Sequence, residues 1–130
     1  MSAKPKRILI ADDDPDIVES LKIVLESEGY VVDTAASGKA CLESVAKKKP
    51  DLIVLDVMMD STTDGFHTSY ELKKDPVHKE IPVVMLTAIG KATGMHFDRK
   101  EDEDYLPVEE FIEKPVDPKV LLATVKKYVG

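Results

Sequence analysis

The 130-residue chain carries a formal net charge of −7, and 43% of its residues are hydrophobic. This length fits one domain, residues 1–130, which buries enough surface to need no disulfide or structural metal. An acidic chain is repelled by phosphate backbones, so we expect no direct nucleic-acid binding. The first apolar run is too short for a signal peptide or a membrane span, which favours a cytoplasmic protein without membrane insertion.

Short apolar runs alternate with helical patterns along the chain. In chain order, the predicted elements are a strand at Arg7–Ala11, a helix at Asp14–Glu28, a strand at Tyr30–Ala35, a helix from Ser37 through Lys48, a strand at Leu52–Leu55, a helix from Asp64 or Gly65 to Lys74, a strand at Ile81–Leu86, a weak strand at Phe111–Ile112 and a helix after Asp117. Runs this short, rich in Ile, Val and Leu, are typical of strands buried on both faces. The alternation predicts an α/β fold with a parallel sheet between helical layers.

The predicted helices have start signals and apolar stripes. Ser37 and Asp117 are expected N-caps, and Pro15 and Pro118 sit where a helix loses least from a missing N–H. Cys41, Leu42, Val45 and Ala46 are expected to face inward in the second helix, and Phe66, Tyr70 and Leu72 are available for packing in the third. Residues at helical spacing are Ile17, Val18, Leu21, Val24 and Leu25 in the first helix and Val120, Leu121, Ala123, Thr124, Val125 and Tyr128 in the last. Cys41, the single cysteine, is interpreted as a small buried apolar residue.

The stretch from Ile89 to Val108 breaks the alternation. A fourth helix is expected here, but Gly90 and Gly94 interrupt its start and no good apolar stripe follows. The segment at 98–104 is mostly acidic. We therefore expect this helix to be atypical or poorly formed.

Polar residues follow the predicted strands at their carboxyl ends, where open α/β sheets bind ligands. Asp12, Asp13 and Asp14 follow the first strand, and Asp56 ends the third. Thr87 ends the fourth strand, and Lys114 follows the fifth. Each of these features alone has an ordinary explanation, such as a helix cap, a turn residue or a solvated side chain. Their occurrence at successive strand ends predicts one common site.

Converging carboxylates repel one another unless a cation joins them, and oxygen ligands suit Mg²⁺. We expect Asp13 and Asp56 to bind Mg²⁺ directly, Asp12 to hold a metal-bound water, and the backbone carbonyl of Met58 to be a further ligand. Lys114 would pair with a carboxylate at rest and with a phosphoryl oxygen afterwards, to which Thr87 could also donate. A carboxylate nucleophile, a metal and a cationic clamp together form a phosphoryl-transfer site.

The sequence resembles the response-regulator receiver family over nearly its whole length. The stretches that carry the resemblance are RILIADDDPDI (7–17), PDLIVLDVMM (50–59), DGF (64–66), IPVVMLTA (81–88) and FIEKPV (111–116). The resemblance implies a CheY-like, flavodoxin-like doubly wound three-layer sandwich with a five-stranded parallel sheet. It also implies that a histidine kinase or phosphotransfer protein phosphorylates Asp56, that Thr87 and Lys114 hold the phosphoryl group, and that Phe111 is the switch aromatic.

Further expectations follow from this resemblance. The Lys114–Pro115 peptide is expected to be cis. The protein would assist only its own phosphorylation and dephosphorylation, so it would not be an enzyme. We expect no output domain after the last helix, that is, a stand-alone domain whose output is binding to a downstream protein. The loop MMDSTTDG (58–65) departs from the family, because Asp60 stands where receivers commonly have Pro, and Asp60 or Asp64 could touch the cation or its waters.

The sequence argues against two alternative functions and leaves a third open. A phosphatase of the haloacid-dehalogenase type needs a second Asp two residues after its nucleophile, where this chain has Met58. A flavodoxin-like cofactor carrier needs a Ser/Thr/Gly-rich loop after the first strand, where Asp12–Asp14 would repel a phosphate. The third alternative is a receiver-like scaffold that works without phosphorylation.

Overall fold

The computed structural model describes residues 5–56, 68, 71–76, 78–87, 110–114 and 116–129. Its elements are β1 (Arg7–Ala11), α1 (Pro15–Ser27), β2 (Val31–Ala35), α2 (Gly38–Lys47), β3 (Leu52–Asp56), β4 (Val83–Thr87), β5 (Glu110–Glu113) and α6 (Pro118–Val129). Thr68 and residues 71–74 are also helical. The predicted start of this helix, the loop at 58–65, the segment 89–108 and the Lys114–Pro115 peptide lie outside the described residues.

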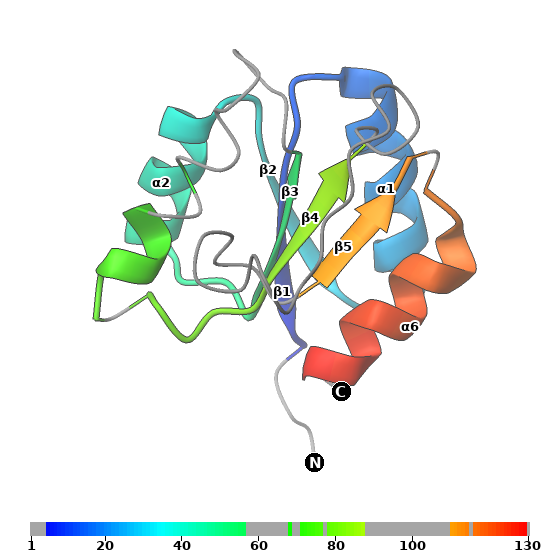
Figure 1. The fold of residues 1–130 in the computed structure, drawn as a ribbon. Coiled ribbons are helices and arrows are strands. Elements are labelled where there is room, and N and C mark those ends of the chain that lie inside the picture. Colours follow the sequence, from blue (N-terminus) through cyan, green and yellow to red (C-terminus); the bar gives the residue numbers. More distant parts are fainter. Residues whose placement is uncertain are drawn as a thin grey trace.

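The five strands form one parallel sheet in the order β2-β1-β3-β4-β5. The strand order reverses direction at β1, because β2 lies on one side of it and β3 on the other. In Figure 1, α2 covers one face of the sheet, while α1 and α6 cover the other. The arrangement confirms the expected flavodoxin-like, doubly wound fold with a five-stranded parallel sheet.

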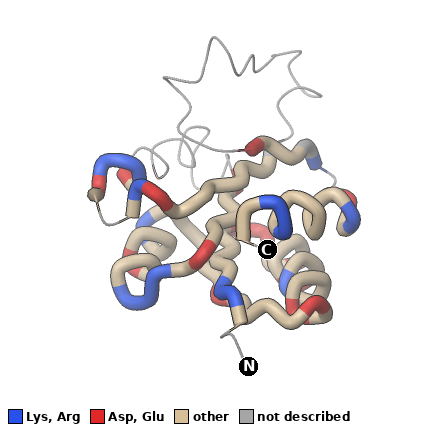
Figure 2. The backbone as a smooth tube through the Cα atoms, turned by 90° about the horizontal axis from the view of Figure 1, so that it is seen from below, with Lys and Arg blue, Asp and Glu red and all other residues tan. Residues whose placement is uncertain are grey.

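Alternate residues of the central strands belong to two separate apolar layers. On the α2 face, Leu9, Ile53 and Met85 pack with Cys41 and Leu72. On the opposite face, the second layer is formed from α1, α6 and the other strand residues, including Ile8, Ile10, Leu52, Val54, Leu21, Leu25, Leu121 and Val125. Since both faces of β1 and β3 are buried, these strands are apolar without alternation. Charged residues lie mostly on helices and connecting segments (Figure 2).

The helix caps follow the sequence signals. The Asp14 carboxylate accepts from the backbone N–H of Asp16 at 2.9 Å and caps α1. The Ser37 hydroxyl accepts from Ala40 N at 3.0 Å, and the Asp117 carboxylate accepts from Lys119 N at 2.8 Å. These contacts satisfy N–H groups that a helix cannot pair internally.

One predicted inward position, Ala46, is wrong, and two residues of the pattern in the last helix do not face the core. Ala46, Val120 and Ala123 are exposed, Val120 by 47% of its surface. Each lies about 100° or more around its helix from the residues that face the sheet, so it points beside the core rather than into it. Leu122, which was not expected to face inward, packs against the core instead. Cys41 is buried as expected.

Four strands differ from the predicted bounds by one or two residues. β2 begins at Val31 rather than Tyr30, and β3 ends at Asp56 rather than Leu55. β4 spans Val83–Thr87 rather than Ile81–Leu86, and β5 spans Glu110–Glu113 rather than Phe111–Ile112. Among the helices of the described residues, none is long and apolar enough to cross a membrane.

Two residues of α1 give a direct test of the packing. Leu25 is fully buried, and Ile23 on the same helix is 58% exposed. Leu25→Ala should reduce the free energy of unfolding by about 2–5 kcal/mol, because it removes a buried side chain and leaves a cavity. Ile23→Ala should change it by about 0.5 kcal/mol or less. Urea unfolding of both variants measures the difference, and equal losses would contradict the assigned face of α1.

Candidate functional site

Three carboxylates meet at the carboxyl ends of β1 and β3. The two strands are paired in parallel with Ala11 opposite Leu55, so the next residues, Asp12 and Asp56, lie side by side. Asp12 and Asp56 are buried, with 2% and 3% of their surfaces exposed, whereas Asp13 is exposed. Carboxylate oxygens of Asp12, Asp13 and Asp56 lie within 4.8 Å of one another. The sheet therefore assembles a compact acidic cluster from two separate parts of the sequence.

Two hydrogen bonds fix Asp12 in this position. Its backbone N–H donates to the Ala35 carbonyl at 3.0 Å, which ties the end of β1 to the end of β2. Its Oδ1 accepts from Asp14 N at 2.9 Å. Asp14 itself turns its carboxylate onto the first turn of α1, and so it serves as a cap. The role of Ala35 has no side-chain signal, and only the pairing of β1 with β2 identifies it.

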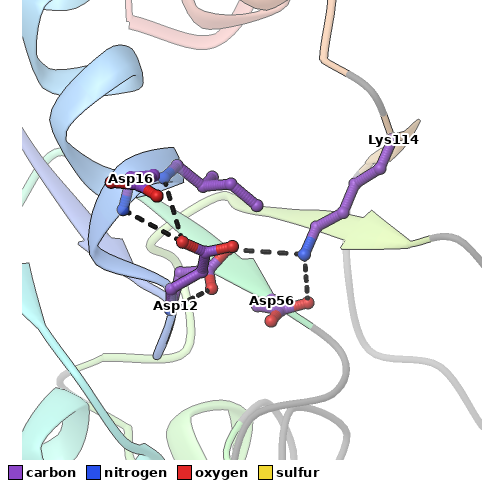
Figure 3. Close-up of polar contacts among 6 residues, drawn as sticks. Asp12, Asp16, Asp56 and Lys114 are labelled. Carbon is purple, nitrogen blue, oxygen red and sulfur yellow. Dashed lines mark hydrogen bonds and ion pairs between the residues drawn. The ribbon is translucent and has the colours of Figure 1, made fainter.

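Lys114 bridges the two buried carboxylates (Figure 3). It follows β5, and its Nζ donates to Asp56 Oδ1 at 3.1 Å. The same Nζ lies 3.5 Å from Asp12 Oδ2. One ammonium thus contacts two carboxylates that come from β1 and β3.

Burial and neighbouring charges shift the pKa values of two residues in this cluster. Burial raises the pKa of Asp12 to about 6, and the neighbouring charge of Asp56 adds to the rise. The hydrogen bond from Asp14 and the charge of Lys114 counteract it only in part. Burial by itself lowers the pKa of Lys114, but the charges of Asp56 and Asp12 outweigh it and leave that pKa above its ordinary value.

The cluster has the composition of a site for a hard divalent cation. Asp12 Oδ2 is buried and has no hydrogen-bond partner in the described part of the chain. Three carboxylates face one ammonium, so a divalent cation would satisfy this oxygen and offset the remaining negative charge. A donor set made only of oxygens suits Mg²⁺. The residues present therefore fit the metal that the sequence predicts.

The other predicted site residues are described to different extents. Thr87 is the last residue of β4, at the same edge of the sheet as Asp56. Phe111 lies on β5, is half-buried and packs against the core layer on the α2 face. Met58, Asp60 and Asp64 lie outside the described residues. The structure thus brings together Asp12, Asp13, Asp56 and Lys114, and it places the backbone of Thr87 at their edge.

Comparisons with known proteins agree with this arrangement. Residues 8–126 match the family described as "Response regulator receiver domain". The chain is 40% identical over 122 residues to the DNA-binding dual master transcriptional regulator RpaA of Synechocystis, covering 92% of this chain and 47% of that protein. A crystal structure of a putative response regulator from Chloroflexus aurantiacus is similar with a TM-score of 0.84 and 32% identity, covering 97% of this chain and 98% of that one.

A chemotaxis protein also shares the fold. The chemotaxis protein CheY4 of Vibrio cholerae is similar with a TM-score of 0.83 and 27% identity, covering 96% of this chain and 99% of that one. The curated relatives are longer, because the chain spans 45% of the first one and 25% of the response regulator PleD of Caulobacter vibrioides.

The raised pKa of Asp12 predicts a stability that depends on pH. The pKa of Asp12 is about 6 in the folded protein, above the ordinary value of 3.8, so the folded protein binds this proton more tightly than the unfolded chain. The ionised carboxylate therefore lowers the free energy of unfolding, and the whole of this loss is present above about pH 6. Without Mg²⁺, Asp12→Asn should raise the free energy of unfolding at pH 7.5 by on the order of 1–3 kcal/mol.

The gain in free energy of unfolding from Asp12→Asn should shrink as the pH falls from 6 to 4, because Asp12 is then protonated in the folded protein. Urea unfolding of both proteins at pH 7.5 and pH 4 measures it. A variant that is less stable than the parent at pH 7.5 would contradict the electrostatic account of the cluster.

Proposed function

The chain belongs to the response regulator receiver domain family, and from this we propose that it is a switch that accepts a phosphoryl group on Asp56 with the help of Mg²⁺. Receiver domains act in two-component signalling. The Asp56–Lys114 contact of 3.1 Å, inside a cluster of three carboxylates, is the observation that carries the proposal. The metal would be held by Asp12, Asp13, Asp56 and the carbonyl of Met58. When bound, it would neutralise negative charge on the incoming phosphoryl group.

The chemistry is a transfer between two nucleophiles. A carboxylate oxygen of Asp56 forms a bond to phosphorus as the bond from phosphorus to the donor's histidine nitrogen breaks, and the imidazole leaves with that electron pair. Asp56 suits this role because it is buried at a rigid strand end. Lys114 already contacts that carboxylate, so its ammonium is placed to bind a phosphoryl oxygen.

The response follows from the added charge. A phosphoryl group brings about two negative charges and three acceptor oxygens to Asp56. These oxygens would recruit the Thr87 hydroxyl at the end of β4, and Phe111 on the adjacent β5 would respond as the switch aromatic. β4 and β5 pair through Met85 and Phe111, so a change at the end of β4 reaches β5 directly. A downstream protein would read the altered surface.

The proposed partners follow from the same role. A histidine kinase or phosphotransfer protein would supply the phosphoryl group, and a downstream protein would receive the signal. The domain would assist only its own phosphorylation and dephosphorylation. A cytoplasmic location is consistent with these partners.

Intact mass spectrometry after incubation with a small phosphodonor tests the proposal. The protein should gain one phosphoryl group only with Mg²⁺, and Asp56→Asn should gain none. Lys114→Ala should slow the reaction by on the order of 10²-fold, because a cationic donor to the phosphoryl oxygens is lost. Lys119→Ala, which removes an exposed lysine of α6, should react like the parent.

Phosphorylation of Asp56→Asn at the parental rate would contradict the assignment of Asp56. A folded parent protein that gains no mass from either the small donor or a phosphorylated histidine phosphotransfer protein would favour the phosphorylation-independent scaffold instead.

A further inference from the structure

The opposite end of the sheet carries a second surface of interest. Two hollows lie at the amino ends of the strands, with volumes of about 420 and 220 Å³. Lys6, Lys48 and Val31 help to line the first. Pro50, Glu80 and Pro82 help to line the second, and Lys49 and Asp51 belong to both. We call this continuous surface the amino-end groove.

The cations of the amino-end groove are largely unpaired. Arg7 is an exception, because its guanidinium donates to Asp33 at 2.7 Å. Lys6, Lys48 and Lys49 make no ion pair with residues that the structure describes, although the whole chain has a net charge of −7. Figure 2 views the molecule from this end and shows Lys and Arg beside the N-terminus. The groove is thus a local basic region on an acidic protein.

The charge of the groove is polarised along its length. Lys6 and Lys48 line only the first hollow and Lys49 lines both, whereas Glu80 lines only the second, before β4 at the far end. Asp51, in the middle, already accepts from Arg7 N at 2.8 Å. A uniform polyanion such as a nucleic acid would meet Glu80, and repulsion there would weaken its binding. A ligand with negative charge at one end only would avoid this cost.

The backbone of the groove offers few donors for a single small anion. The N–H of Val31 donates to the Lys6 carbonyl at 2.9 Å, and the N–H of Asp51 donates to the Arg7 carbonyl at 2.7 Å. The N–H of Arg7 is bound to Asp51. The lysine side chains supply further donors at separate positions, which suits several separate carboxylates better than one phosphate.

The dimensions of the groove fit an extended peptide. It crosses the amino ends of β2, β1, β3 and β4, which is three strand spacings or about 14 Å. About four residues of extended chain cover this distance. Val31, Pro50 and Pro82 give it apolar walls between the charged ends.

We propose that the amino-end groove binds an extended segment of a partner protein with acidic residues against Lys6, Lys48 and Lys49 and apolar residues over Pro50 and Pro82. The groove lies at the opposite end of the strands from Asp56, so this inference does not rest on the proposed function. Binding of the segment leaves the acidic cluster accessible to Mg²⁺ and to a phosphodonor.

A peptide of two glutamates followed by two leucines tests this proposal by NMR titration of the ¹⁵N-labelled protein. The amide shifts should saturate and be confined to residues around 6, 31, 48–51 and 80–82. Lys48→Glu with Lys49→Glu should weaken binding about tenfold, as expected for the loss of two partly exposed charge contacts. Lys39→Glu with Lys119→Glu gives the same change in net charge at exposed positions elsewhere and should weaken binding less than about twofold.

Three results would overturn the proposal. These are no saturable shifts with the peptide, equal weakening in the two double variants, and tighter binding of a single-stranded oligonucleotide to the same residues. A Mg²⁺-dependent phosphorylation rate that stays unchanged in the Lys48→Glu, Lys49→Glu variant separates this surface from the acidic cluster. A loss of phosphorylation in that variant would overturn the independence of the two surfaces.

Discussion

The contact of one ammonium with two buried carboxylates is the constraint on which the site depends. Lys114 reaches Asp56 at 3.1 Å and Asp12 at 3.5 Å, and burial holds the pKa of Asp12 at about 6. Buried carboxylates repel each other and lose hydration, so the fold must supply compensation. The parallel pairing of β1 with β3 brings the two acids together, and Lys114, which directly follows β5, contacts both of them. An additional divalent cation would complete the compensation.

This arrangement makes the site responsive to charge. Lys114 is shared between two acids, so a phosphoryl group on Asp56 would compete for the same ammonium. The strands that would carry the response are short and fully packed, with β4 between β3 and β5. Since a close-packed interior transmits small displacements, a change at the carboxyl edge of β4 need not remain local. The close packing of the sheet and the charges at its carboxyl edge are therefore coupled.

Much of the fold could be predicted from the sequence because both faces of its strands are buried and its helices have side-chain caps. The runs at β1 and β3 and the caps Ser37 and Asp117 are clear signals in the sequence. Solvent exposure of Ala46 and Val120 was missed, because an apolar stripe does not show where the neighbouring layer ends. Sequence also could not separate the buried Asp12 from the exposed Asp13, or reveal that one lysine contacts two acids, since strand order determines both.

The most direct test of the account is the melting temperature of the protein as a function of Mg²⁺ concentration. Mg²⁺ should raise it in the parent protein, because a cation that binds only the folded cluster stabilises that state. Asp13→Asn should abolish most of the rise, whereas Asp16→Asn, an exposed acid on the first turn of α1 outside the cluster, should retain it. An equal rise in both variants, or no rise in the parent, would contradict the claim that the Asp12, Asp13 and Asp56 carboxylates form a magnesium site.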